Sequence, residues 1–320
     1  MVSDQTLMAD SDRPLLSLVV PFYNEEPVIE AFHARIVPVL QGTGESFEVI
    51  CVNDGSRDKT ADMLDALSGR DARFKAAHFS RNFGHQAAVT AGVHLAKGQC
   101  AIIIDADLQD PPELIESLLA KWREGFDIVY AQRRARTGEG RMKRATAFLF
   151  YRTLARITET EMPLDTGDFC LLDRKVIDVM NAMREHNRYL RGLRAWVGFR
   201  QAAVEFDRRE RYAGASKYPL RRMVRFALDG VISLSWAPLR MAIWLGLVSA
   251  LISILVAVVL LVAKLTGRYD SPGFAAIVAV VLFLSGVQLV CIGAVGEYIG
   301  RIYDEVKERP LYIIARKSGF

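Results

Sequence analysis

Two long hydrophobic runs stand near the end of a chain whose first two-thirds alternate shorter apolar and polar segments. The runs cover residues 241–263 and 274–295, and neither contains a charged side chain. As helices of about 22 residues, each would extend roughly 33 Å, which matches the hydrocarbon core of a bilayer. A buried core helix rarely stays apolar on every face over this length. The pattern therefore predicts two membrane-spanning helices, with a buried helical hairpin as the alternative.

A different pattern fills the first 135 residues, where short apolar runs alternate with segments of helical spacing. Strands are expected at 16–20, 48–52, 74–79, 101–104 and 127–131, and helices at 28–40, from Asp58 to 67, at 86–96 and at 112–123. This alternation predicts an α/β fold with a doubly wound, mainly parallel sheet and helices on both faces. Ligands of such sheets bind beyond the carboxyl ends of the strands. The polar residues that follow each strand are therefore where chemistry is expected.

Two amphipathic stretches follow, at 142–157 and 218–234. In the second, Arg221, Arg222 and Arg225 oppose apolar residues just before the first hydrophobic run, which predicts an interfacial helix on the membrane. An ordinary helix that packs against the domain is the alternative. The expected organisation is a polar tail at 1–14, a cytoplasmic enzyme domain at 15–217, an interfacial region at 218–240, the two spans within 241–300, and a tail at 301–320.

Charge sets the expected orientation and narrows the partners. The net charge of +4 over 320 residues gives no sign of a nucleic-acid partner, and the N-terminal tail lacks the apolar core of a signal peptide. Basic residues flank the two runs on their outer sides, whereas the connecting loop holds only two: Arg221, Arg222, Arg225 and Arg240 before, Arg301, Lys307, Arg309, Arg316 and Lys317 after, Lys264 and Arg268 between. The positive-inside rule then puts both tails in the cytoplasm and the short loop outside it.

Carboxylates after the expected strands are the main candidates for chemistry. Asp105-Ala106-Asp107 follows the fourth strand, where two carboxylates could share a hard divalent cation that bridges to substrate phosphates; turn chemistry is the alternative. Asp54 follows the second strand and could accept hydrogen bonds from a nucleoside, or could form an Asx-turn in which Gly55 has a positive φ. The chain has no Walker lysine loop and no GxGxxG motif, so neither an ATPase nor a dinucleotide enzyme is indicated.

These strand ends carry a resemblance to the family-2 inverting glycosyltransferases, in Pro21-Phe22-Tyr23-Asn24-Glu25, Val52-Asn53-Asp54-Gly55-Ser56 and Asp105-Ala106-Asp107. Further segments resemble the polyprenyl-phosphate branch, which includes bactoprenol glucosyltransferases and dolichol-phosphate mannose synthase. They are Phe79-Ser80-Arg81-Asn82-Phe83-Gly84, Asp105–Glu113, Asp165-Thr166-Gly167-Asp168-Phe169, Ser216-Lys217-Tyr218 and Gly296-Glu297-Tyr298-Ile299-Gly300-Arg301-Ile302-Tyr303. The resemblance implies a Rossmann-like nucleotide-diphospho-sugar transferase fold, a sugar-nucleotide donor, Mg²⁺ or Mn²⁺, and a polyprenyl-phosphate acceptor.

The resemblance also implies roles for individual residues. Pro21, Tyr23, Glu25, Asp54 and Arg81 are expected to hold the nucleotide, and Asp105 and Asp107 to hold the donor and its metal. Asp165 is the expected base or acceptor-orienting carboxylate, with a turn cap as the alternative; Asp165 and Asp168 are expected in a turn around Gly167. His85 is expected to be a local hydrogen-bonding residue.

Cations near the fifth strand and the expected interfacial helix are candidates for phosphate binding. Arg133 and Arg134 follow the strand, and Arg211, Ser216 and Lys217 lie just before the helix, at the level where a lipid phosphate would arrive. The alternative for each charge is a solvated surface position.

The expected reaction is transfer of a hexose, glucose from UDP-glucose, to undecaprenyl phosphate with inversion, at the bacterial inner membrane. GDP-mannose or a modified arabinose nucleotide is the alternative donor. A lipid-sugar flippase and a non-catalytic membrane scaffold are the alternatives of another class. Glycines of the second run permit close helix approach, and a homotetramer is expected from the resemblance.

Overall fold

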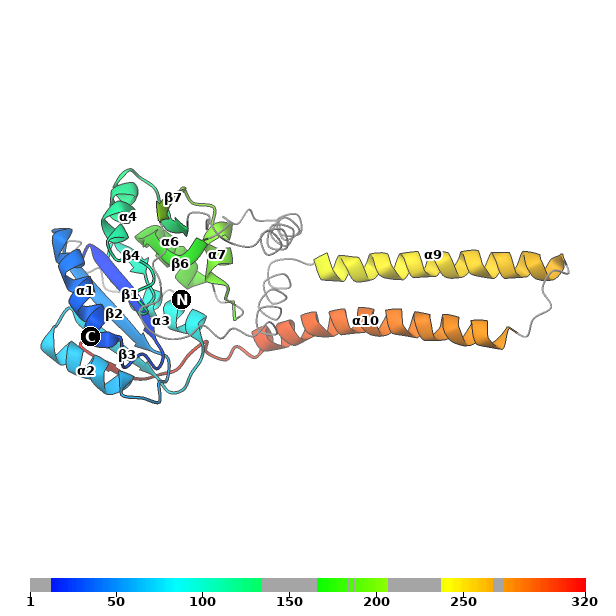
Figure 1. Cartoon of the computed structure of the whole chain (residues 1–320), viewed down its shortest axis with the longest axis horizontal. Helices are drawn as coiled ribbons and strands as arrows, with labels where there is room; N and C mark the ends of the chain where they lie inside the picture. The colour runs from blue at the N-terminus through cyan, green and yellow to red at the C-terminus, as the bar shows by residue number, and fades with distance from the viewer. Residues whose placement is uncertain (1–12, 134–165, 184, 187, 207–236, 267–272) are drawn as a thin grey trace, which may run out of the picture. The chain divides into compact units, whose positions relative to one another are not determined.

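The computed structural model describes residues 13–133, 166–183, 185–186, 188–206, 237–266 and 273–320 (Figure 1). These residues form an α/β unit and a helical unit, and the last 11 residues, Pro310–Phe320, belong to the α/β unit. The two expected amphipathic segments, 142–157 and 218–234, lie outside the described residues.

Eight strands form one sheet in the order β7-β5-β6-β4-β1-β2-β3-β8. Its parallel half confirms the first four expected strands, which are β1 (Leu16–Phe22), β2 (Phe47–Asn53), β3 (Phe74–Phe79) and β4 (Cys100–Ile103). Their side chains are almost all buried, as expected for strands covered on both faces.

The other half of the sheet departs from the expected parallel arrangement. β6 (Thr166–Asp173) lies between β4 and β5 (Ile128–Arg133) and is antiparallel to both, whereas β7 (Gln201–Phe206) is parallel to β5. The sheet is therefore mixed. Because β6 runs opposite to β4, the start of β6 lies at the edge where β4 ends, so Asp168 belongs to a strand and not to the expected turn.

Helices cover both faces of the sheet, as expected. One apolar core joins the sheet to α1 (Ile29–Gly42), α2 (Thr60–Arg70) and α4 (Leu114–Arg123). A second core, on the other face, joins it to α3 (His85–Leu95), α6 (Arg174–Ala182) and α7 (Leu190–Trp196). Asp58, the expected cap of the second helix, accepts a hydrogen bond from the Thr60 backbone N–H at 3.1 Å.

The C-terminal residues complete the sheet. β8 (Ile314–Ser318) pairs antiparallel with β3, so these residues are part of the α/β unit, and the separate tail expected at 301–320 is wrong for this segment. Three groups contact the Asp65 carboxylate of α2: Arg316 Nη2 at 2.5 Å, the Ser318 hydroxyl at 2.5 Å and His78 Nε2 at 3.0 Å. Two of them, Arg316 and Ser318, belong to β8, so these contacts fix the strand to α2. A five-residue strand with two cations has no apolar alternation, so its pattern did not predict a strand.

The helical unit consists of α9 (Ala237–Leu265) and α10 (Phe274–Val306), which lie side by side (Figure 1). Cys291 Sγ donates a hydrogen bond to the Ala242 carbonyl at 3.4 Å. Within them, Leu239–Leu265 and Phe283–Val306 have mean hydropathies of 3.0 and 1.4 and are long and apolar enough to cross a membrane.

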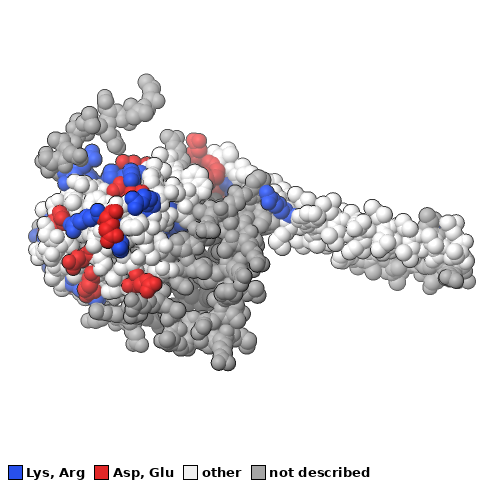
Figure 2. Space-filling view, turned by 90° about the horizontal axis from the view of Figure 1, so that it is seen from above, with Lys and Arg blue, Asp and Glu red and all other residues white. Residues whose placement is uncertain are grey.

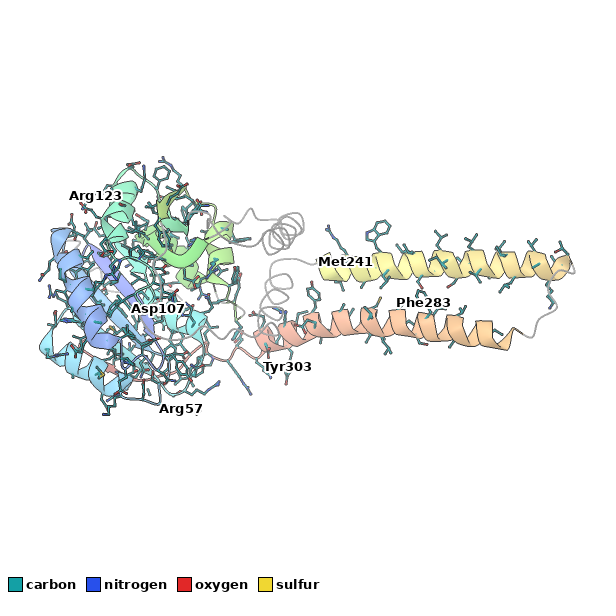
Figure 3. All side chains as sticks on the ribbon, in the orientation of Figure 1. Arg57, Asp107, Arg123, Met241, Phe283 and Tyr303 are labelled. Carbon is teal, nitrogen blue, oxygen red and sulfur yellow. The ribbon has the colours of Figure 1, made fainter. Side chains whose placement is uncertain are left out.

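Apolar side chains of both helices, including Met241 and Phe283, point outward (Figure 3). Figure 2 shows charges of both signs over the α/β unit and an almost uncharged surface along the helices. The described parts of these helices bury almost none of this surface, so the buried-hairpin alternative finds no support.

We expect the Asp65→Asn variant to be less stable than the wild type near neutral pH, and this difference in stability to become smaller as the pH falls. Burial opposes ionisation of Asp65, but Ser318, His78 and Arg316 outweigh it, so the pKa of the Asp65 carboxyl is lowered. A lowered pKa in the folded state stabilises the fold above the unfolded value of about 4, and this stabilisation is lost as the pH falls through the folded value. Thermal unfolding of the full chain in detergent should show a Tm difference from the wild type that is larger at pH 6 than at pH 3.

The exposed Asp62 of the same helix provides the matched control, Asp62→Asn. A Tm difference for Asp65→Asn that stays constant between the two pH values would contradict the assignment of this ion cluster.

Candidate active site

The turns that follow β1 and β2 are bound to each other at the carboxyl edge of the sheet. Asn24, which has a positive φ of 54°, accepts from the Arg57 backbone N–H at 2.8 Å and donates its own N–H to the Ser56 hydroxyl at 2.9 Å. The Glu25 N–H donates to the Thr60 hydroxyl at 3.0 Å. Tyr23 is left 44% exposed at this edge. The two turns thus form one frame with an exposed aromatic ring on it.

Pro21 does not share this exposure. It lies buried within β1, where it pairs with Val52 of β2. Of the residues expected on the first turn, Tyr23 and Glu25 therefore follow the end of β1, whereas Pro21 lies within this strand.

Asp54 holds the next loop, residues 80–84, against this frame. Its buried carboxylate accepts from the Phe83 N–H at 2.6 Å, the Gly84 N–H at 2.9 Å and the Asn82 side-chain amide at 2.9 Å. Burial raises the pKa of Asp54, although the two backbone N–H groups oppose that shift. The structure thus gives Asp54 a role in fixing the loop, and the expected contact with a nucleotide stays a prediction.

Gly55 allows the two loops to approach so closely. Its φ of +64° confirms the expected positive value, and a Cβ at this position would lie 2.3 Å from the carbonyl carbon of Arg81. Arg81 itself is exposed, and its guanidinium carbon lies 4.3 Å from the centre of the Phe83 ring. The loop therefore presents a cation that is supported by an aromatic ring.

Asp105 and Asp107 follow β4 at the same edge, and Asp107 is visible there in Figure 3. The Asp105 side chain is 43% exposed, and Asp107 Oδ1 accepts from the Gln109 N–H at 3.1 Å. Asp107 thus forms the side-chain hydrogen bond of a turn, as in the alternative interpretation, and this bond uses one oxygen of its carboxylate. Burial raises the pKa of Asp105, the charges of Asp168 and Asp107 add to the shift, and His85 and Arg191 oppose it.

Asp168 joins a second cluster beside this pair. Arg191 Nε donates to Asp168 Oδ1 at 2.7 Å, and His85 Nε2 lies 3.2 Å from Asp168 Oδ2 and 3.7 Å from Asp105 Oδ1. Burial alone would raise the pKa of Asp168, but His85 and Arg191 outweigh it and hold that pKa far below its usual range. His85 is therefore a hydrogen-bonding residue, as expected, but its partners come from distant segments and are not local.

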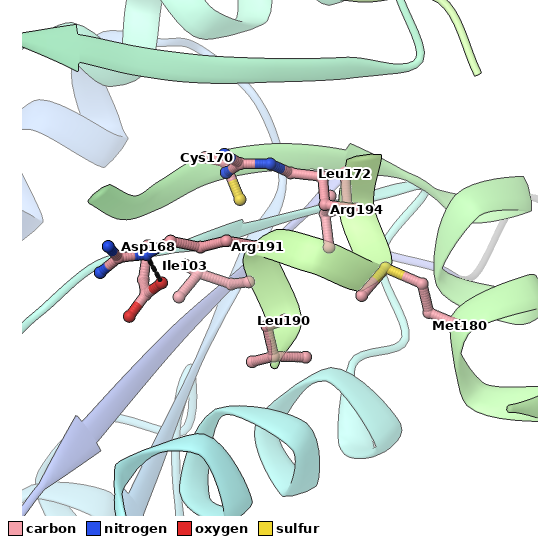
Figure 4. A pocket seen from close by; sticks show the side chains of 8 residues that line it. All are labelled: Ile103, Asp168, Cys170, Leu172, Met180, Leu190, Arg191 and Arg194. Carbon is pink, nitrogen blue, oxygen red and sulfur yellow. Dashed lines mark hydrogen bonds and ion pairs between the residues drawn. The ribbon is translucent and has the colours of Figure 1, made fainter. Parts of the chain in front are cut away.

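A small hollow lies behind this cluster (Figure 4). Asp168 and Arg191 contribute its charged contact, drawn as a dashed line in Figure 4, and Ile103, Leu172 and Met180 contribute apolar walls. Such surroundings strengthen the attraction between the two charges. The result is a fixed, ionised carboxylate next to the Asp105–Asp107 pair.

The acidic pair fits a divalent cation of the kind that sugar nucleotides carry. Within the described ranges no group of three or more histidine, cysteine or acidic side chains forms a complete metal cage. Mg²⁺ is commonly held by one or two carboxylates together with substrate phosphates and water, and Mn²⁺ accepts the same oxygen ligands. Burial is the main cause of the raised pKa of Asp105, and the nearby charges of Asp168 and Asp107 add to it, so a bound cation would favour the ionised carboxylate.

Several of the expected site residues lie wholly or partly outside the described residues. Arg133 ends β5, paired with Phe206, at the carboxyl edge that it shares with β4. Its side chain lies outside the described parts of the chain, as do five whole residues: Arg134, Asp165, Arg211, Ser216 and Lys217.

The local sequence pattern did not predict that Arg191 and Asp168 would meet at this site. Arg191 lies on a seven-residue helix, which is too short for periodicity to identify a functional face. Asp168 lies in one of the segments that resemble the family, but its contact with Asp105 through His85 depends on the antiparallel insertion of β6.

The acidic pair beyond β4 and the joined loops after β1, β2 and β3 lie at the carboxyl edge of the sheet, where ligands of such folds bind. The family model of glycosyl transferase family 2 matches residues 17–180, and that of the GtrB C-terminal hairpin matches residues 237–302. The chain belongs to glycosyl transferase family 2 and is a glycosyltransferase. The hairpin match and the exposed apolar helices associate it with a membrane.

Curated relatives match almost the whole chain. A Bacillus subtilis (strain 168) protein named uncharacterized glycosyltransferase YkcC is 46% identical, over 95% of this chain and 94% of its own length. The SfII prophage-derived bactoprenol glucosyl transferase of Shigella flexneri is 40% identical, over 94% of this chain and 97% of its own. Glucosyl-3-phosphoglycerate synthase from Mycobacterium tuberculosis, solved with Mn²⁺, UDP-glucose and phosphoglyceric acid, gives a TM-score of 0.47 at 21% identity, over 70% of this chain and 80% of that one.

We expect Gly55→Ala to destabilise the fold and to weaken binding of UDP. The added Cβ would strain a left-handed backbone, a cost of roughly 1–3 kcal/mol, and would also push the Arg81 loop away. Gly44→Ala is the matched control, because Gly44 has a φ of +72° but no described atom within 4 Å of the place that a Cβ would take. Thermal unfolding and UDP titration should show a larger loss for Gly55→Ala, and equal losses in the two variants would contradict the close approach.

Proposed function

We propose that this enzyme transfers glucose from UDP-glucose to undecaprenyl phosphate, with inversion, releasing UDP. One observation carries the proposal: the carboxylate edge of a family-2 glycosyltransferase and an exposed apolar hairpin occur in one chain. Support comes from relatives named bactoprenol glucosyl transferase, which are 38–40% identical over 94–95% of this chain.

On the donor side, Tyr23, Glu25, Asp54 and Arg81 form the proposed nucleotide frame. Asp105 and Asp107 would hold Mg²⁺ or Mn²⁺ for the diphosphate of the donor. When bound, such a cation stabilises the negative charge of the departing nucleoside diphosphate. The frame and the acidic pair lie at the same edge of the sheet, as the two ends of one donor require.

On the acceptor side, the lipid phosphate is itself the nucleophile. A phosphate monoester has a second pKa near 6, so it is largely dianionic at neutral pH, and a general base is less necessary than it is for a sugar hydroxyl. One of its oxygens forms the bond to the anomeric carbon while the bond from that carbon to the diphosphate oxygen breaks. The electron pair leaves with UDP, and a single displacement inverts the carbon.

The proposed acceptor cations are Arg133, Arg134, Arg211 and Lys217, with Ser216 as a hydroxyl donor beside them. Asp165 is the proposed acceptor-orienting carboxylate or base. Asp168 is a poor base, because its strongly lowered pKa gives the carboxylate little affinity for a proton. Its contacts instead fix Arg191 and His85 next to Asp105.

The proposed location is the bacterial inner membrane, with the α/β unit in the cytoplasm and the loop between α9 and α10 outside it. The return of β8 to the sheet supports this arrangement, because the chain before α9 and after α10 then lies on one side. The proposed homotetramer rests on the family resemblance alone.

The reaction is tested by label transfer into lipid. Purified full-length protein, undecaprenyl phosphate and Mg²⁺ or Mn²⁺ are incubated in parallel with labelled UDP-glucose, UDP-galactose, UDP-N-acetylglucosamine, GDP-mannose and an arabinose nucleotide. We expect lipid-linked label from UDP-glucose. Label from another donor would correct the sugar, and UDP binding without transfer from any donor would favour the non-catalytic scaffold.

Asp107→Ala provides the inactive reference in the same assay. Because the acidic pair acts on charge that develops during transfer, we expect turnover to fall by about 100-fold or more while UDP binding without metal is retained. Glu116→Ala on α4 removes an exposed carboxylate elsewhere and should leave turnover unchanged. Equal activity of Asp107→Ala and the wild type would refute the proposed metal site.

The orientation is tested by labelling single cysteines in intact cells with a membrane-impermeant thiol reagent. Cysteine at position 270, between the two apolar helices, should react from outside, whereas cysteine in place of the exposed Lys317 of β8 should react only after the membrane is opened. The reverse pattern would invert the proposed topology.

A further inference from the structure

The segment that leads from α10 to β8 makes an aromatic contact with the end of β3. The Tyr312 ring stacks on the Phe79 ring, with centroids 5.1 Å apart and an interplanar angle of 10°. The Tyr312 hydroxyl forms a hydrogen bond of 2.7 Å with His94 Nδ1 of α3. The Ser80 N–H, the first of loop 80–84, donates to the Ile313 carbonyl at 3.0 Å. Residues just before β8 therefore touch the first residue of the donor-side loop.

The same contacts continue into the loop. Phe79 meets Phe83 edge to face, with centroids 5.7 Å apart, and Phe83 carries the Arg81 guanidinium over its ring. The Phe83 backbone N–H is also one of the donors to Asp54. The position of Arg81 thus depends on Phe83, which is held by Asp54 through its backbone and by Phe79 through its ring.

We infer that Tyr312 is a positioning residue for the donor-side loop 80–84, acting through Phe79 and Phe83 on Arg81. This inference rests on the proposed function, in which Arg81 contacts the sugar nucleotide. Tyr312 touches no substrate. Its ring stacks on the Phe79 ring, which Phe83 meets edge to face, so it limits the positions that Phe79 and hence Phe83 can take.

The placement of Tyr312 along the chain gives the contact a consequence. Tyr312 follows α10 by a few residues and precedes β8, whereas Arg81 is more than 200 residues earlier in the sequence. The donor-side loop is therefore held in part by the segment that returns from the apolar hairpin. A donor site of full affinity requires that segment to be docked on β3.

Three full-length variants test the inference. Tyr312→Leu keeps apolar volume but removes the flat ring, Tyr312→Phe keeps the ring and removes only the bond to His94, and Phe320→Leu removes an aromatic ring of the same segment that contacts Lys75 and Lys317 instead. The readouts are UDP titration with Mn²⁺, KM and kcat for the donor, and hydrogen exchange of the Phe83 and Gly84 amides without nucleotide.

For Tyr312→Leu we expect the Kd for UDP and the donor KM to rise about fivefold, with kcat within about twofold of the wild type. Exchange of the Phe83 and Gly84 amides should accelerate. Tyr312→Phe and Phe320→Leu should behave as the wild type does in all three readouts.

Wild-type UDP affinity and wild-type amide exchange in Tyr312→Leu would overturn the inference even if hexose transfer is confirmed. Faster amide exchange with unchanged UDP affinity would also overturn it, because the role of Tyr312 would then be structural only. Faster exchange and weaker UDP binding in a protein that transfers no hexose would support the inference and reject the proposed reaction.

Discussion

The buried carboxylate of Asp54 is the interaction on which the donor side of this site depends. It sits at the end of a central strand and accepts three N–H groups from the loop that follows the neighbouring strand. A buried charge is stable only when its oxygens are hydrogen-bonded, so the loop must keep its geometry for Asp54 to remain ionised. The absence of a Cβ at Gly55 lets the two backbones approach closely enough for these bonds. The shape of loop 80–84 is thus a property of the packed sheet edge and not of an independent loop.

The acidic centre follows a different rule, in which cations divide the roles of neighbouring carboxylates. Arg191 and His85 contact Asp168 and lower its pKa, whereas burial raises the pKa of Asp105, which lies 3.7 Å from His85. The charge of Asp168 is therefore balanced within the protein, whereas His85 and Arg191 only partly offset the effects that raise the pKa of Asp105. In the proposed function, this difference assigns the metal to Asp105 and Asp107 and leaves Asp168 outside the ligand set.

The sequence predicted what local pattern controls and missed what pairing controls. Apolar runs and the polar residues at their ends identified β1–β4 and the positions of Tyr23, Asp54, Asp105 and Asp107. A buried parallel strand and the turn that follows it both depend on residues that are adjacent in the sequence, so a local pattern is enough to predict them. The antiparallel entry of β6 is a choice between distant partners with similar apolar content, and no local pattern encodes it. Asp168, Arg191 and His85 meet only through that choice. β8 was missed for the same reason, since its charged side chains are stabilised by Asp65 of α2 and not by apolar burial.

The C-terminal strand also constrains how the chain can meet a membrane. A strand that is hydrogen-bonded to β3 must lie in the same compartment as the rest of the sheet, which includes β7. Any crossings between β7 and β8 must therefore be even in number. The described chain offers two helices with the length and the exposed apolar surface to cross, which satisfies this condition with a single hairpin. Because the returning segment also contacts the loop that carries Arg81, the anchor and the donor site are joined by a short stretch of chain. β3 thus pairs with the strand that follows the hairpin and is continued by the loop that carries Arg81, so one strand supports both the returning segment and the loop of the proposed donor site.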